Sequence, residues 1–294
     1  MKQSKRFFCL MLTVVFSIVG ILGIQTPPTQ AKRIINKVKL LENGKTYSYD
    51  INGDGKKESI LVKVVETYSN NIAITTTIYV NGNVYYKLKS KYGICAQVLL
   101  CDLYANQKGA NLLIEHYGES DGLSSLRVIK CEKDKGTLLA SMSGKTFGKL
   151  NIYRINLSSL KVTGNGTFTM LVDTPIYLGN FGCYFVSIPF KISGKKIKLT
   201  PKKSYKISSD FTYKLKKQAT LYTKPSKKAS KTTLAVGSKL KIVAVYPVSY
   251  NKKKYIATSF VKVKTKSGKT GWIFDKSNVT DKNKLCGINI PQWG

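Results

Sequence analysis

The chain has 294 residues, of which 43% are apolar and 22% are charged, and this is enough apolar sequence for one large or two small packed cores. The composition therefore excludes an intrinsically disordered protein. The 49 Lys and Arg outnumber the 15 Asp and Glu, so the net charge of +34 favours acidic partners, and a single histidine disfavours imidazole-based catalysis.

The first 31 residues have the pattern of a secretory signal peptide. A basic segment, residues 2–6, precedes an uncharged run over 7–24, and the small residues Thr29 and Ala31 follow at the positions that a signal peptidase requires. We expect cleavage after Ala31 and a mature protein that is secreted, extracellular or cell-wall associated, without a transmembrane anchor. An uncleaved membrane anchor is the alternative, because the run is just long enough to span a bilayer.

Residues 32–210 are expected to form an antiparallel β-domain, either propeller-blade-like or a sandwich. Apolar and polar residues alternate over 60–68, 72–80 and 84–88, and Asn81-Gly82 between the last two runs is typical of a tight hairpin. No long stretch with a period of 3.6 residues follows the signal. The predicted fold class is all-β.

Oxygen-bearing side chains alternate along the loop that precedes the first of these strands. Asp50, Asn52 and Asp54 occupy its first, third and fifth positions, with Gly55 at the sixth and Glu58 at the ninth. A tight loop of this kind can wrap a hard cation, and calcium suits the spacing. An Asx-rich turn that holds no metal is the alternative.

This segment, residues 49–62, resembles the aspartate-rich loops of the integrin-type FG-GAP and VCBS repeats. In those repeats the side chains at loop positions one, three, five and nine bind calcium. The resemblance therefore implies a weak calcium site made of Asp50, Asn52, Asp54 and Glu58. A second, degenerate copy at 102–114 keeps too few acids for a metal, and chance similarity of the two units is an open alternative.

Residues 212–281 are expected to form a second, smaller domain, followed by a tail at 282–294. Residues 211–294 carry 19 Lys and 2 Asp, which leaves +17 in less than a third of the chain. An aromatic strand, a long first loop, a glycine before the second strand, a distal Ser267-Gly268 turn and a closing Gly271-Trp272-Ile273 resemble a bacterial Src homology 3 domain, which implies a small β-barrel.

Binding to cell-wall peptidoglycan or to a teichoic-acid-like polyanion is what this resemblance and the charge imply. The candidate groove aromatics are Tyr222, Tyr246, Tyr250 and Tyr255. The mature chain has only three Arg, the residue on which base readout most depends, so sequence-specific nucleic acid binding is not expected.

We expect no catalysis. One alternative is a cell-wall-directed hydrolase that uses carboxylates such as Asp102, Glu115 and Glu119, and another is an adhesin for host glycans. The odd number of mature cysteines and their apolar surroundings predict buried thiols rather than a disulfide framework.

Overall fold

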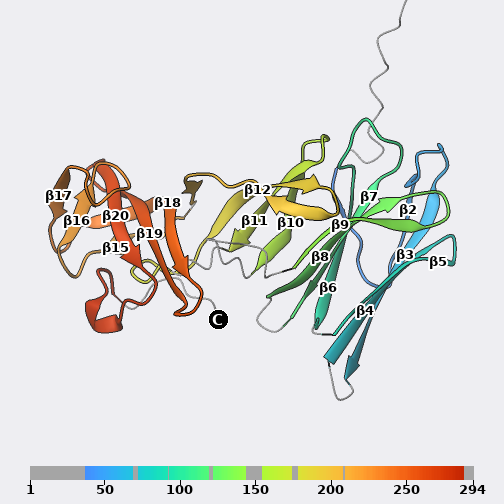
Figure 1. Cartoon of the computed structure of the whole chain (residues 1–294), viewed down its shortest axis with the longest axis horizontal. Helices are drawn as coiled ribbons and strands as arrows, with labels where there is room; N and C mark the ends of the chain where they lie inside the picture. The colour runs from blue at the N-terminus through green and yellow to red at the C-terminus, as the bar shows by residue number, and fades with distance from the viewer. Residues whose placement is uncertain are drawn as a thin grey trace, which may run out of the picture. The chain divides into compact units, whose positions relative to one another are not determined.

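The structure is a computed structural model (Figure 1) that describes residues 37–68, 72–91, 93–118, 122–143, 154–173, 178–207 and 209–287. In these ranges the regular structure is β-strand, apart from a single 3₁₀ turn at Asp281–Asn283, so the all-β prediction is confirmed. The predicted signal peptide lies outside the described residues. Within the described ranges, no helix is both long enough and apolar enough to span a membrane.

Three four-stranded antiparallel meanders follow one another along residues 46–199. The first contains β2 (Thr46–Tyr49), β3 (Glu58–Tyr68), β4 (Ile72–Val80) and β5 (Asn83–Ser90). The second contains β6 (Cys95–Cys101), β7 (Asn111–Tyr117), β8 (Leu123–Cys131) and β9 (Gly136–Ser143). The third contains β10 (Ile155–Val162), β11 (Thr167–Asp173), β12 (Phe185–Ser193) and β13 (Lys196–Leu199).

The second and third meanders join into one nine-stranded sheet. A parallel contact between β9 and β13, at Ser141 and Lys196, connects them, and the short β1 (Lys39–Leu40) pairs with the end of β6. The strand order is β1-β6-β7-β8-β9-β13-β12-β11-β10, and the β10 edge curls back to lie close to β6, so the sheet is a nearly closed barrel. Figure 1 shows β6 to β13 in green to yellow.

The two copies of the loop-and-strand unit that begin near Asp50 and Asp102 have the same order of loop and strands. Asp50 and Asp102 are 52 residues apart, and β7, β8 and β9 begin within one residue of that offset from β3, β4 and β5. Each loop also bonds to the next repeat: Ala110 N donates to Ile51 O at 2.7 Å, and Gly166 N donates to Leu103 O at 2.8 Å.

The second half of β6 and most of β7 are buried on both faces, which explains their apolar runs Val98-Leu99-Leu100 and Leu112-Leu113-Ile114. Leu99 and Leu113 face a core shared with β10 to β13, and Leu100 and Leu112 face a second core against β2 to β5. The middle meander is therefore sandwiched between the other two.

The predicted strands and turn of the first meander are present. Asn81 and Gly82 have φ values of 50° and 82°, and positive φ at both central residues is what a two-residue hairpin with right-handed twist needs. The turn determines how β4 pairs with β5, and this pairing determines which face of the two strands packs on the core.

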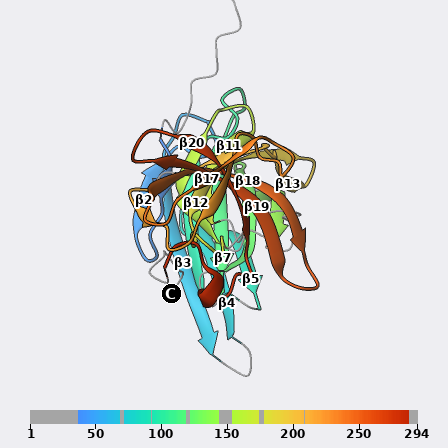
Figure 2. The same cartoon turned by 90° about the vertical axis from the view of Figure 1, so that its left-hand side faces the viewer.

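A third sheet is formed near the C-terminus by seven strands. They are β14 (Tyr205–Lys206), β15 (Tyr213–Lys214), β16 (Ala219–Tyr222), β17 (Lys231–Leu234), β18 (Lys239–Asn251), β19 (Ile256–Thr265) and β20 (Thr270–Lys276). The order is β14-β18-β19-β20-β16-β17, and β15 also pairs with β18. Figure 2 shows the long β18–β19 hairpin from a second direction. The 3₁₀ turn follows β20, and Cys286 then bridges to Leu215 beside β15.

Hydrogen bonds tie this sheet to the turn between β11 and β12. Asn180 donates from its backbone N and its side chain to Asp275 Oδ1, Leu285 N donates to Asn180 Oδ1, and Tyr213 Oη donates to Phe181 O. The pair β14–β18 includes residues before the predicted boundary near 210. The division of the chain into separate domains stays a prediction.

The five cysteines of the described residues form no disulfide. Four are buried and Cys95 is half-buried. Burial raises the pKa of the Cys131 thiol to about 12, which leaves it an inert hydrophobic side chain, as the apolar surroundings predicted.

Candidate functional site

The loop between β2 and β3 brings three predicted ligand residues together. Carboxylate oxygens of Asp50, Asp54 and Glu58 all lie within 4.8 Å of one another. Backbone N–H groups hold the Asp50 carboxylate in place, because Gly53 N and Gly55 N donate to its two oxygens at 2.7 and 2.9 Å. Carboxylates at this separation repel, so the donor set suits a hard divalent cation.

The fourth predicted ligand, Asn52, has a different orientation. Its Oδ1 accepts from Asp54 N at 2.8 Å, and its Nδ2 donates to Asp54 Oδ2 and Glu58 Oε1, both at 3.2 Å. Asn52 therefore presents a hydrogen-bond donor to the acidic cluster and would ligate a metal only after its amide turned over.

A basic cavity lies at one end of the β18–β19 hairpin. Its volume is about 460 Å³, and four of the residues that line it are lysines: Lys239, Lys241, Lys264 and Lys266. We call it the lysine hollow. Asp210 Oδ1 lies 3.8 Å from Lys241 Nζ, but its side chain is fully exposed and screens the charge only weakly. The hollow thus remains positively charged.

The same face of the sheet continues into a group of aromatic side chains. Lys264 and Lys262 are two residues apart on β19 and so share a face, and Lys262 pairs with Trp272, which in turn pairs with Tyr222. We call Tyr222, Tyr246, Phe260, Trp272 and Phe274 the aromatic face. Trp272 lies half-buried on this outer face, opposite the buried Val261 and Ile273.

Two of the four predicted groove tyrosines belong to the aromatic face. Tyr246 packs edge-on against Trp272, with ring centroids 6.3 Å apart, and Tyr222 packs edge-on against Phe260 at 5.8 Å. Tyr250 packs against the core, and Tyr255 is 78% exposed in the turn between β18 and β19. The structure therefore brings Tyr222 and Tyr246 together around Trp272, and not Tyr250 or Tyr255.

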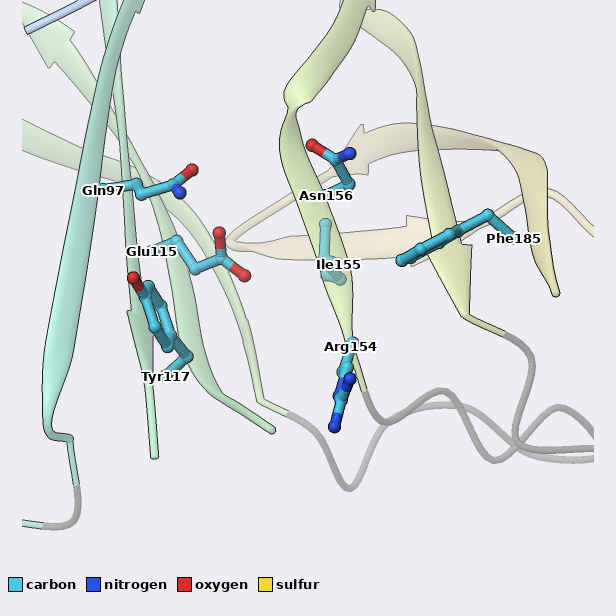
Figure 3. A pocket seen from close by; sticks show the side chains of 7 residues that line it. All are labelled: Gln97, Glu115, Tyr117, Arg154, Ile155, Asn156 and Phe185. Carbon is cyan, nitrogen blue, oxygen red and sulfur yellow. The ribbon is translucent and has the colours of Figure 1, made fainter. Parts of the chain in front are cut away.

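A third candidate site lies between β6 and β10, where the nine-stranded sheet fails to close. Figure 3 shows this cavity of about 320 Å³, which we call the β6–β10 pocket. The residues that line it come from four strands and from the residue that precedes β10: Gln97, Glu115, Tyr117, Arg154, Ile155, Asn156 and Phe185.

Of the three carboxylates considered for a hydrolase, Glu115 lines this pocket. Asp102 is buried at the end of β6 and does not line it, and Glu119 lies outside the described residues.

The sequence interpretation missed both the lysine hollow and the β6–β10 pocket. Lysines alternate with apolar residues along β18 and β19, so period-two reasoning could have placed Lys241 and Lys264 on one face. No sequence signal identifies the pocket, because its walls come from positions as distant as Gln97 and Phe185. No protein-family model, curated protein or solved structure matches the chain.

Proposed function

We propose that the protein is a secreted, cell-surface or wall-associated binding protein whose C-terminal sheet holds an anionic wall polymer. The lysine hollow is the observation that carries this proposal. Four lysines line it, and dispersed lysines suit a flexible polyphosphate better than a rigid, base-specific ligand. The signal-like N-terminus supports export.

The strand order supports a barrel of the Src homology 3 type in this region. A 3₁₀ turn follows β20, and the chain then bridges at Cys286 to Leu215, next to β15, which itself pairs with the start of β18. The bridge therefore attaches the segment after β20 to the β15 edge of the sheet. The N-terminal region does not consist of separate stacked blades, because the second and third meanders share one nine-stranded sheet. The first meander packs on one face of that sheet, which favours the sandwich alternative.

The aromatic face extends the same binding surface. Lys262 Nζ lies 5.8 Å from the Trp272 ring centroid, and Lys227 Nζ lies 3.8 Å from that of Phe274. In our proposal the lysine hollow takes the phosphates of the polymer, and the aromatic rings contact its sugar or peptide groups.

Cosedimentation with purified sacculi, with and without teichoic acid, tests the proposal. We expect replacement of Lys239, Lys241, Lys264 and Lys266 by Gln to weaken binding to the teichoic-acid-bearing sacculi at least tenfold at low salt. A basic residue near an anionic surface contributes about 1 kcal/mol, so four removals can account for this loss.

A matched control removes the same charge elsewhere. The exposed lysines Lys87, Lys89, Lys133 and Lys135 lie on or near the β5 and β9 strands, and their replacement by Gln should leave binding nearly unchanged. Equal losses in the two variants would mean that net charge alone is responsible, and the lysine hollow would then not be the binding site.

A further inference from the structure

Two strands supply one wall of the β6–β10 pocket with hydrogen-bond acceptors. Gln97 projects from β6 and Glu115 from β7, and Figure 3 shows both side chains pointing across the gap toward β10. Gln97 Oε1 is buried and has no hydrogen-bond donor among the described residues. A buried acceptor without a donor is costly, so this wall is built for a group that donates hydrogen bonds.

The charge of this wall contrasts with the rest of the chain. Glu115 is only 2% exposed, in a protein whose net charge is +34. A carboxylate, like the amide oxygen of Gln97, accepts hydrogen bonds, and its negative charge strengthens those that a cation donates. An ammonium group suits both acceptors, because it has three N–H donors and a full charge.

The opposite wall has the complementary chemistry. Asn156 on β10 and Arg154 just before it carry N–H donors, and Arg154 Nε lies 3.9 Å from Asp173 Oδ2, a contact that favours a guanidinium fixed at this end of the cavity. Phe185 and Ile155 add apolar surface between the polar groups. The pocket therefore has the Gln97 and Glu115 acceptors on one side, and an amide and a guanidinium on the other.

We propose that the β6–β10 pocket binds a small zwitterion of about dipeptide size. Its ammonium group contacts Gln97 Oε1 and the Glu115 carboxylate, and its carboxylate or carbonyl oxygens face Asn156 and Arg154. A volume of about 320 Å³ equals about ten water molecules of the liquid, which suits a ligand of roughly ten to fifteen non-hydrogen atoms. This site is independent of the lysine hollow, which lies on β18 and β19.

Ligand-observed NMR with the full-length protein tests this inference, with dialanine as the probe in its L,L and D,D forms. We expect at least one form to bind with a millimolar or better dissociation constant. N-acetyl-dialanine, which lacks the ammonium group, should bind at least tenfold more weakly. The inference is overturned if neither form binds at about 10 mM, or if acetylation leaves the affinity unchanged.

Two variants and one control assign the binding to this pocket. Glu115→Gln keeps the shape and removes the charge, and Gln97→Met removes the acceptor, so each should weaken dialanine binding, the first at least tenfold. Glu132→Gln removes an exposed carboxylate that pairs with Lys130, and it should bind like the wild type. If Glu115→Gln does not fold, as judged by circular dichroism, Gln97→Met decides, and unchanged affinity in that variant overturns the assignment.

Discussion

His116 is a fully buried ionisable residue whose neutral form the fold favours. It lies on β7, and its Nε2 is 2.8 Å from Thr76 Oγ1 on β4, so it connects two meanders. Burial, helped by the positive charge of Arg127, lowers the pKa of His116 from 6.5 to about 4. Between these pH values the unfolded chain binds more protons than the folded one, so this residue makes stability fall as the pH falls from 6.5 to 4.

Asp275 has the opposite effect over nearly the same pH range. Burial raises the pKa of its carboxyl from 3.8 to about 7, against the lowering effect of the hydrogen bonds from Asn180. The folded chain therefore binds more protons between these values. The contribution of Asp275 to stability is full below pH 3.8 and is lost as the pH rises through about 7.

These opposing effects predict opposite slopes in two variants. In His116→Gln the effect of Asp275 on stability remains, so the free energy of unfolding should fall as the pH rises from 4 to 6.5, by at most about 1.4 kcal/mol per pH unit. In Asp275→Asn the effect of His116 remains, so the free energy of unfolding should rise as the pH rises over the same range. Denaturant unfolding at several pH values measures both slopes. If the two variants have parallel slopes, at least one of the two burial effects is absent.

At the scale of single elements, the loop between β2 and β3 is where a bound ion should act. We predict that calcium binds at the cluster of Asp50, Asp54 and Glu58 with the weak affinity common in extracellular modules, in the range of about 0.1 to 1 mM. Binding should raise the thermal stability, because the ion ties the start of β3 to the loop before it.

Asp54→Ala should abolish this binding, since it removes an exposed carboxylate that contributes little to the core. Calorimetry with millimolar calcium measures the loss, and Asp134→Ala, an exposed acid in the β8–β9 turn, is the control. Heat from the wild type that persists unchanged in Asp54→Ala would place the calcium elsewhere.

At the scale of the whole molecule, the net charge of the mature chain, which is +31 once Lys2, Lys5 and Arg6 are removed, should dominate capture of the wall polymer. The Debye length shortens from about 10 Å at 0.1 M salt to about 3 Å at 1 M, so binding to teichoic-acid-bearing sacculi should weaken steeply over this range. Any binding left at 1 M salt is expected to come from the aromatic face and to be reduced by Tyr222→Ala and Tyr246→Ala. Cosedimentation across a salt series measures the salt-dependent and the salt-resistant binding. Binding that does not weaken as the salt concentration rises would contradict electrostatic capture.

Local pattern alone determined much of this protein. Alternating residues predicted β3, β4 and β5, and Asn81-Gly82 predicted their turn, because strand faces and positive-φ turns depend on neighbouring residues. The acidic cluster was predictable for the same reason, since its three carboxylates lie within nine residues of one another.

Long-range pairing decided the rest. The parallel contact of β9 with β13, the gap between β6 and β10, and the position of Glu115 across from Asn156 depend on which strands meet, and strand pairing between distant segments leaves no local periodicity. The same holds for Trp272: alternation along β20 separates its two faces, but only the packed sheet determines which face is covered by the core and which remains outside.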